Sequence, residues 1–407
     1  MSTDLTGAGV ARMSHDEVVG WAHSMVPRLA VRAAEAEHLR RLPDATIADC
    51  DAAGIWRLVV PPDRGGFGLG LRTLCEMTRT LAQGCMSTAW TVSFLTLHNW
   101  FVYRAEASVQ AAVLGDRPWI RLATPLAPGG EAVPVEGGYR LTGRWQWATG
   151  ILHSDWVSVM AFVPPAADAP EGTPPKPRVL LAPVGDVEVI DVWHVSGMRA
   201  TGSHDVAADG LFVPDVHTMS VDDLRGEDTA GARLRPDLPF LRYPMSSVLT
   251  LYAAATAVGG AEAAVAGFRG LVATRLLPHT PGQPQGEQAT SQARLGEALA
   301  TVGAARAVWS AAIGDLCSVY DAGGSIPRPE RARFRLAAAH AVKLAREAVE
   351  VCGVGAGASR YFDHEPFQRI ERDLAMLKGH VVFDWDRVTE LAGRMALGQA
   401  PSPVDML

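Results

Sequence analysis

The sequence has little that would mark a secreted, metal-binding or nucleic-acid-binding protein. Its 407 residues include five cysteines, an odd number with no C-x-x-C pair, so neither a disulfide framework nor a zinc site is predicted. The formal net charge is −7, which predicts no basic surface for nucleic acid. We therefore expect no metal and no nucleic-acid partner.

We also find no long apolar segment in the sequence. The N-terminal stretch MSTDLTGAGVARMSHDE lacks the apolar core of a signal peptide. We find no run of about 18 apolar residues that would span a membrane. A cytoplasmic protein without a membrane partner is expected. With 48% hydrophobic residues, the chain is long enough to build a large core in two or three domains.

What is present is helical periodicity at both ends of the chain and strand-like alternation in the middle. Apolar residues recur with helical spacing over 17–39, 43–54, 71–85 and 87–115, and again over 247–277, 289–320 and 329–352, where Gly353 is expected to end the helix. Short strands are predicted at 120–124, 132–136, 139–148, 156–163, 178–182, 187–193 and 205–213. The predicted fold class is α+β, with an N-terminal helical domain (1–115), a central β-barrel or sandwich (116–225) and a C-terminal four-helix bundle (226–407).

The stretch Tyr139–Val163 carries the first functional interpretation. Trp145 and Trp147 lie two apart on an expected strand, so they are predicted to share one sheet face as a flat aromatic wall. The Thr149 hydroxyl would lie at its rim, because Gly150 lets the chain bend there. Such a wall suits a planar ring ligand, but it equally suits a Trp-rich sandwich core.

A second aromatic group lies in the helix expected over 87–115. Trp90, Phe94 and His98 are spaced i, i+4, i+8, so they line one helix face. This stripe is about 12 Å long and ends in an imidazole. A histidine on an apolar face is either a core residue or an acid–base group, whose ordinary pKa lies near neutrality.

Longer motifs resemble the acyl-CoA dehydrogenase superfamily along nearly the whole chain. The run G-x-W-x-W-A-T-G at 143–150, with H-x-D-W at 153–156, is similar to the flavin-ring segment of a particular branch. That branch contains the reduced-flavin-dependent monooxygenases, including p-hydroxyphenylacetate hydroxylase. The segments 193–206, with Arg199, and 366–373, which reads P-x-x-R-x-x-R-D, resemble two further signatures of the superfamily.

This resemblance implies a site for reduced FMN or FAD, with O₂ as co-substrate. The residues implied at the cofactor are Trp147, Ala148, Thr149, Thr201, Gly202, Ser203, Gly353, Gly355 and Gly357, and Arg275 is a candidate for the phosphate. The turn Gly353–Gly357 would complete the site of a neighbour in a homotetramer, which the broad apolar faces of 289–352 also favour. Since no pyridine-nucleotide motif is present, a separate NAD(P)H-dependent flavin reductase would supply the reduced flavin.

The resemblance further implies hydroxylation of a small aromatic substrate, phenolic or polycyclic, through a flavin C4a-hydroperoxide. Trp90, Phe94, His98 and Thr124 would line the substrate pocket, and the implied catalytic residues are His98, His380, Thr149 and Thr124. Thr149 would bond near flavin N5, and His380 would control protonation of the peroxide. We expect His380 at the edge of a helical core stripe that ends in Val381, with Asp384 one turn further on to orient it.

Two other enzymes remain open. An acyl-CoA dehydrogenase-like FAD enzyme needs a carboxylate base, and the corresponding stretch Gly379–Val382 contains none. An N-oxygenase of the same fold, acting on an amine, would want a carboxylate or polar cluster in place of Trp90 and His98. A flavin carrier or scaffold without catalysis is also compatible with the fold.

Overall fold

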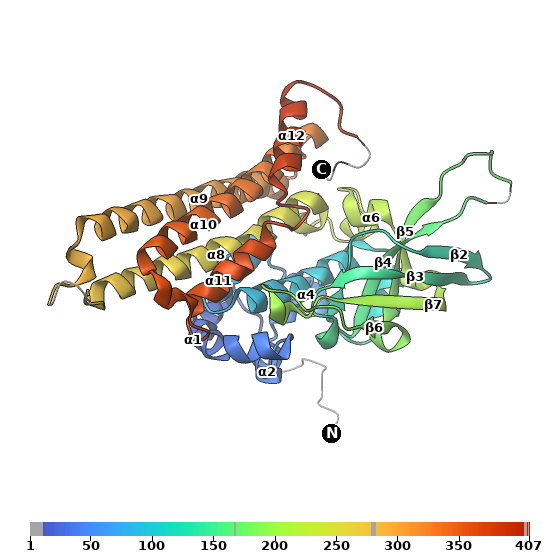
Figure 1. Ribbon diagram of the computed structural model, residues 1–407. Coiled ribbons are helices and arrows are strands. Elements are labelled where there is room, and N and C mark those ends of the chain that lie inside the picture. The colour runs from blue at the N-terminus through green and yellow to red at the C-terminus, as the bar shows by residue number, and fades with distance from the viewer. Residues whose placement is uncertain (1–10, 167, 278–281, 403–404, 406) are drawn as a thin grey trace.

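The computed structural model describes residues 11–166, 168–277, 282–402, 405 and 407, so the first ten residues of the N-terminal stretch lie outside it. Helices form both ends of the described chain and a mixed sheet forms its middle (Figure 1). The N-terminal helices are α1 (His15–Leu39), α2 (Asp44–Ala53), α3 (Leu71–Ala82), α4 (Met86–Arg104) and α5 (Ala107–Leu114). The helix expected over 87–115 is thus two helices, because Ala105 takes an extended conformation and ends α4.

The central sheet has eight strands. They are β1 (Leu122–Ala123), β2 (Glu131–Val135), β3 (Gly138–Ala148), β4 (Trp156–Val163), β5 (Lys176–Pro183), β6 (Glu188–Ile190), β7 (His204–Pro214) and β8 (Thr218–Ser220). Their order is β6-β7-β3-β2-β4-β5-β8, with β1 pairing in parallel with β4. The alternating apolar residues of β3, β4 and β7 fill a separate small core, which includes Leu141 and Val159.

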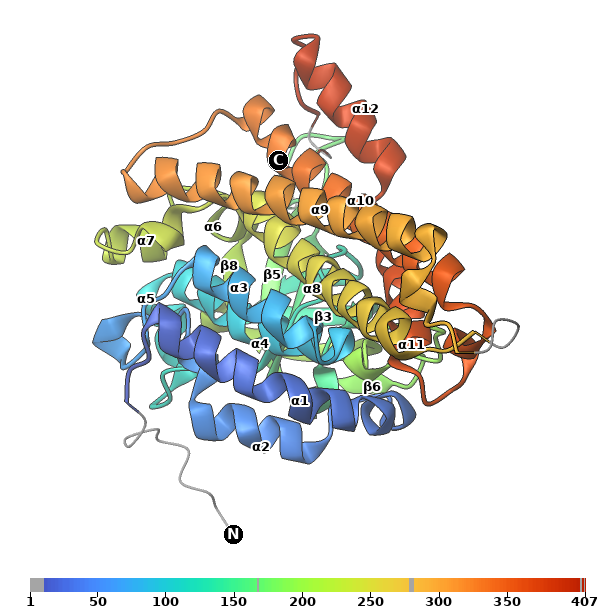
Figure 2. The same cartoon turned by 90° about the vertical axis from the view of Figure 1, so that its left-hand side faces the viewer.

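The C-terminal part begins with two short helices, α6 (Val221–Arg225) and α7 (Ala230–Leu234). The longer helices are α8 (Met245–Thr274), α9 (Ala289–Asp321), α10 (Ala332–Ala356), α11 (Pro366–Leu377) and α12 (Trp385–Ala396). Figure 2 shows α8 between α3 and α4 on one side and α9 and α10 on the other. Small residues permit this packing, since a Cβ on Gly259 would lie 2.0 Å from the Arg79 carbonyl oxygen.

Glycines in α10 have different roles from the one predicted. Gly353 does not end the helix, which continues to Ala356. A Cβ on Gly355 would lie 2.5 Å from the Phe268 ring, so close packing explains this glycine. Gly357 ends the helix instead, with φ +68° and ψ −165°, a conformation that residues with a Cβ avoid.

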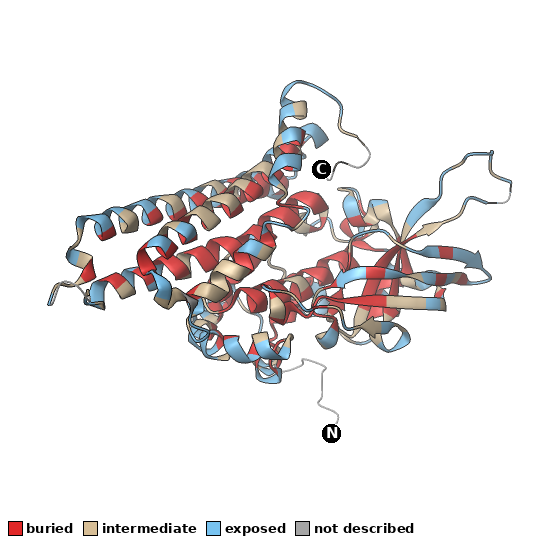
Figure 3. Cartoon of the chain, viewed as in Figure 1, coloured by how far each residue is buried: buried red, intermediate tan, exposed pale blue. Residues whose placement is uncertain are grey.

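Among the residues that the structure describes, one helix, α8, has the length and composition expected of a membrane span, with a mean hydropathy of 1.4. Our prediction that no such segment exists was therefore wrong. The protein buries 89% of the most apolar window of this helix, and Figure 3 shows α8 largely as buried. Its apolar side chains are accounted for by packing against α3, α9 and α10.

Candidate active site

An aromatic row follows one face of α4. The rings of Trp90 and Phe94 stack at 4.5 Å between centroids, and the Phe94 ring meets the His98 ring edge-on at 5.6 Å. Phe101 stacks on the other side of His98 at 5.0 Å. The predicted helical spacing places these side chains together because residues three and four apart share a helix face.

His380 joins this row from the other end of the chain. Its ring lies 5.5 Å from the ring of Trp90 and meets it edge-on. The structure therefore brings both candidate histidines into one aromatic cluster, with Trp90 and Phe94 between them. These four residues come from α4 and the segment after α11, and α11 itself also packs against α4.

The local structure around His380 differs from our prediction. Helix α11 ends at Leu377, and two successive turns follow, closed by bonds from His380 N to Leu377 O (3.0 Å) and from Phe383 N to His380 O (2.8 Å). Asp384 caps α12 through the Arg387 amide and does not orient the imidazole.

The predicted stripe of core residues does not extend to Val381. Val381 is 43% exposed, because the turns after Leu377 carry it away from the helix face that Leu374 and Leu377 share. His380 is thus held by a turn, not by a helix.

The protonation state of His98 follows from its surroundings. Burial lowers the pKa of His98 to about 4, so the ring is neutral at pH 7. Its Nδ1 lies 2.6 Å from the Leu122 carbonyl oxygen, which can only accept, so the single ring hydrogen is on Nδ1. Nε2 keeps its lone pair and, although buried, has no hydrogen-bond partner among the described residues. His98 therefore offers an acceptor to a ligand.

His380 offers the opposite polarity. Burial lowers its pKa to about 4, so it is also neutral at pH 7. The Val382 amide donates to Nδ1 at 3.4 Å, which places the ring hydrogen on Nε2. In the described part of the chain, no carboxylate makes an ion pair or hydrogen bond with either His98 or His380. The cluster thus has one neutral acceptor and one neutral donor.

Two further hydroxyl groups come from chain segments beside α4, since both β1 and α8 pack against that helix. Thr124 follows β1 directly, and its Oγ1 accepts a bond from Ser158 at 2.9 Å, so its own hydrogen stays available. Tyr252 on α8 is a residue that sequence reasoning missed. Its ring lies 5.0 Å from Phe94, and its buried hydroxyl has no partner in the described structure. Only tertiary packing reveals it, since it lies within an apolar helix.

The predicted aromatic wall does not form. Trp145 is 2% exposed and belongs to the sheet core, where its Nε1 donates to the carbonyl oxygens of Gly129 and Met160, both at 2.9 Å. Trp147 is 58% exposed, with its ring 6.3 Å from that of Trp193. The cause is an irregularity in the β3–β7 register between Trp145 and Ala148, which breaks the simple alternation of faces. Trp147 therefore offers an open aromatic surface without Trp145.

A chain of hydroxyl groups runs beside Trp147, and we call it the hydroxyl chain. Thr149 Oγ1 lies 2.9 Å from Ser203 Oγ, which lies 2.8 Å from Thr201 Oγ1. The Thr201 hydroxyl donates to the Met198 carbonyl oxygen at 3.0 Å. The turn after β3 and the T-G-S segment, far apart in sequence, thus meet in the structure. Gly202 permits this with φ +52°.

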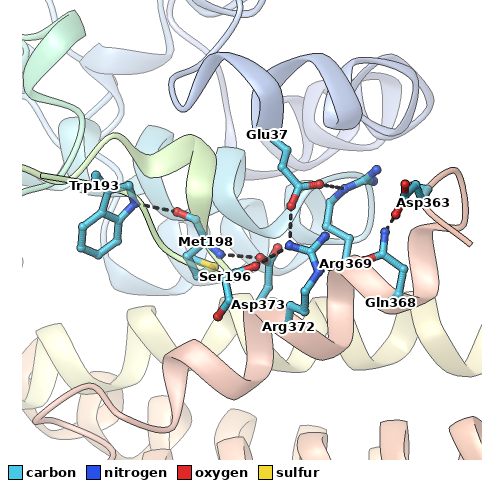
Figure 4. A network of polar contacts seen from close by, with 9 residues as sticks. All are labelled: Glu37, Trp193, Ser196, Met198, Asp363, Gln368, Arg369, Arg372 and Asp373. Carbon is cyan, nitrogen blue, oxygen red and sulfur yellow. Dashed lines mark hydrogen bonds and ion pairs between the residues drawn. The ribbon is translucent and has the colours of Figure 1, made fainter. Parts of the chain in front are cut away.

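A polar network (Figure 4) ties the loop of Met198, whose carbonyl accepts the last bond of the hydroxyl chain, to both helical parts. On α11, Asp373 Oδ1 accepts the Met198 N–H at 2.5 Å. Burial raises the pKa of Asp373 to about 7, against the lowering effect of this bond. A Cβ on Gly197 would lie 2.1 Å from the Arg372 carbonyl oxygen, so α11 and this loop touch through their backbones.

Glu37 of α1 completes the network, and sequence reasoning did not find it. It pairs with Arg372 and with Arg369, the latter at 3.2 Å, and Arg372 also donates to the Ser196 carbonyl. Burial alone would raise the pKa of Glu37, but the hydrogen bonds and charges of Arg372 and Arg369 lower it. The R-x-x-R-D segment thus positions the loop before T-G-S.

The other implied cofactor residues lie elsewhere in the chain. Arg275 Nη1 donates to the Ala356 carbonyl oxygen at 2.7 Å, beside Gly357. This group is at the end of α8, a helix about 45 Å long by its rise per residue. Figure 1 shows that end of the bundle pointing away from the sheet. One chain therefore does not bring Arg275 and Gly357 to the hydroxyl chain.

The side chains gathered here fit a flavin ring. Exposed Trp147 lies two residues from Thr149, whose oxygen keeps an unused lone pair, and the aromatic row holds two neutral histidines, of which His98 is fully buried. In the chain as described, no group of three His, Cys, Asp or Glu side chains is placed to hold a metal ion. A cavity of about 390 Å³ opens elsewhere, against Leu71 and Phe240, and contains neither candidate histidine.

Comparisons with known proteins give matches along most of the chain. Two family models match, "Acyl-CoA dehydrogenase, N-terminal domain" at residues 11–106 and "Acyl-CoA dehydrogenase, C-terminal domain" at 251–385. A "Pigment production hydroxylase" of a Rhodococcus species is 33% identical over 389 residues, covering 95% of this chain and 97% of the relative. The "Flavin-dependent monooxygenase, oxygenase subunit HsaA" of Mycobacterium tuberculosis is 30% identical, covering 93% and 94%.

A solved structure adds the same result in three dimensions. XiaF from a Streptomyces species, in complex with FADH2 and glycerol, superimposes with a TM-score of 0.89 at 30% identity, covering 97% of this chain and 98% of that one. Family models, relatives and fold therefore converge on the architecture and the branch that the residue motifs resemble. The chain belongs to the acyl-CoA dehydrogenase family, within its branch of flavin-dependent monooxygenases.

Proposed function

We propose that the protein is the oxygenase component of a two-component flavin-dependent monooxygenase that hydroxylates a small aromatic substrate, phenolic or polycyclic. The observation that carries this proposal is the unpaired Nε2 of neutral, buried His98 in an aromatic row. Bound reduced FMN or FAD would supply the activation of O₂. One oxygen atom goes to a ring carbon of the substrate, and the other leaves as water with the two electrons of the flavin.

His98 and its neighbours would hold the substrate. The lone pair on Nε2 accepts the hydrogen of a substrate hydroxyl, which gives the oxygen phenolate character and makes the ring more nucleophilic. Trp90 and Phe94 provide flat apolar surfaces for the substrate ring. The free hydrogen of Thr124 can donate to the same hydroxyl oxygen. Acceptor and donor together fix the ring position.

His380 would act on the oxygen side. Its hydrogen on Nε2 can be donated to an oxygen atom, and its low pKa keeps it neutral. Trp90 and His98 are buried, which would limit the access of water that otherwise diverts the oxidant into hydrogen peroxide. Thr149 on the hydroxyl chain would contact the flavin ring near N5. His98 and His380 would therefore act at different stages.

The proposal includes a separate NAD(P)H-dependent flavin reductase, cytoplasmic localisation and a homotetramer in which Arg275 and the Gly353–Gly357 turn serve a neighbour's flavin. Their distance from the hydroxyl chain supports the tetramer. So do the apolar side chains exposed beside them, with Leu276 at 61%, Val354 at 63% and Phe362 at 59%. Light scattering tests the assembly. A monomer that still binds reduced flavin tightly would contradict it.

The test of the function compares electron sources. The isolated chain should oxidise NADH no faster than buffer, but should hydroxylate phenols when reduced FMN or FAD is supplied with oxygen. The dehydrogenase alternative predicts that acyl-CoA bleaches bound oxidised FAD. The N-oxygenase alternative predicts that amines, not phenols, are oxygenated. NADH turnover without a reductase would contradict the two-component proposal.

A further inference from the structure

The direction of the hydroxyl chain follows from the hydrogens available to it. Each hydroxyl has one hydrogen to donate and lone pairs that accept. At the inner end, Thr201 Oγ1 lies 3.0 Å from the Met198 carbonyl oxygen, which can only accept. The hydrogen of Thr201 must point at Met198, since two oxygens at this distance repel each other without a hydrogen between them.

The remaining hydrogens are then determined in turn. Thr201 has no second hydrogen, so Ser203 Oγ, at 2.8 Å, must donate to it. Ser203 then has none left for Thr149, so Thr149 must donate to Ser203 across their 2.9 Å contact. As a result, Thr149 Oγ1 presents lone pairs, and no hydrogen, to the flavin side of the turn.

The Met198 carbonyl is fixed in place and so defines this polarity. Its own amide is held by Asp373 at 2.5 Å, and Trp193 Nε1 donates to its carbonyl oxygen at 3.1 Å. Met198 adopts φ +53°, a left-handed conformation that costs energy for a residue with a Cβ. Figure 4 shows Asp373 reaching the loop from α11. Asp373 is therefore a positioning residue that acts through Met198.

We propose that the hydroxyl chain makes Thr149 a fixed hydrogen-bond acceptor that selects the reduced form of the flavin ring. The inference rests on the proposed function. Reduced flavin carries a hydrogen on N5 and can donate, whereas oxidised flavin has only a lone pair there. A fixed acceptor bonds the first and repels the second. Ser203, Thr201 and Asp373 set this selectivity without needing to touch the ring.

The test measures binding and not turnover. Full-length wild type and Ser203→Ala are titrated without oxygen with FMN and FAD, each oxidised and reduced. Removing the Ser203 oxygen frees the Thr149 hydrogen to turn outward, so oxidised flavin gains a donor, while reduced flavin keeps an acceptor that is no longer fixed in direction. For each flavin, the ratio of the dissociation constant of the oxidised form to that of the reduced form should fall about tenfold, as expected for a change of one hydrogen bond. Ser203→Thr, which keeps the hydroxyl, should restore it.

A matched control lies in the same turn. The Ser154 hydroxyl donates to the Gly150 carbonyl at 3.0 Å and is outside the hydroxyl chain, so Ser154→Ala should leave the ratio unchanged. Oxidised 5-deazaflavin, with C–H in place of the N5 lone pair, should bind wild type more tightly than oxidised flavin does. Ser203→Ala should remove that difference.

Two outcomes would overturn this inference without affecting the proposed function. One is flavin binding by wild type without preference for the reduced form, and the other is an unchanged ratio in Ser203→Ala. Failure to bind flavin in either redox state would refute the proposed function and this inference with it.

Discussion

Replacing His98 by asparagine should remove the substrate acceptor while keeping the fold contact. The asparagine amide nitrogen takes the place of Nδ1 and can still donate to the Leu122 carbonyl, which the imidazole bonds at 2.6 Å. Nothing replaces Nε2. Product formation should therefore fall by about 10²–10⁴, the usual contribution of an acid–base or orienting group, with flavin affinity unchanged.

His98→Asn should also change how the free energy of unfolding depends on pH. The pKa of His98 is lowered to about 4 from its ordinary 6.5, so the unfolded chain binds a proton over a pH range where the folded chain does not. This contribution to stability is present above about pH 6.5 and is lost as the pH falls toward 4, and it amounts to about 2 kcal/mol between pH 7 and pH 5.

Urea unfolding at both pH values measures this difference. Wild type should lose about 2 kcal/mol more than His98→Asn over the interval, and His364→Asn, at an exposed histidine, should behave like wild type. Equal pH dependence in wild type and His98→Asn would refute the neutral, buried imidazole. Unchanged hydroxylation in His98→Asn would refute its contact with the substrate.

Two more substitutions test the other sides of the site. His380→Leu removes the Nε2 hydrogen, so product formation should fall by about 10² while hydrogen peroxide released per flavin rises in a peroxidase-coupled assay; unchanged coupling would refute the donor role. Gly197→Ala places a Cβ 2.1 Å from the Arg372 carbonyl oxygen and should cost about 1–3 kcal/mol in urea unfolding and weaken flavin binding. Gly185→Ala, with nothing within 4 Å, is its control, and equal effects of the two would contradict the close packing of α11.

Local patterns predicted much of the site. The spacing of Trp90, Phe94 and His98 fixes one helix face, because helix geometry depends only on near neighbours. The order of helices, strands and helices follows from the change of period along the chain. These features are local in sequence, so they can be read without the tertiary structure.

What sequence reasoning missed depends on distant contacts or on irregular backbone. Glu37 meets Arg372 across 335 positions, and no spacing rule relates two such residues. Trp147 does not share a sheet face with Trp145, because the pairing of β3 with β7 shifts register between Trp145 and Ala148. Such a shift places the following side chains on the opposite face from the one that simple alternation predicts. His380 lies on a turn after α11. The sequence predicted a helix there, because the helical pattern through Leu377 looked continuous.

Isotope labelling tests the central claim most directly. The protein, without any reductase, is given chemically reduced flavin and a phenol, and is then mixed with ¹⁸O₂ for a single turnover. We predict a ring-hydroxylated product that carries one ¹⁸O atom, and labelled water from the other. A hydroxylated product without ¹⁸O, or no product while acyl-CoA bleaches the bound flavin, would contradict the assignment of this chain as a flavin-dependent aromatic oxygenase.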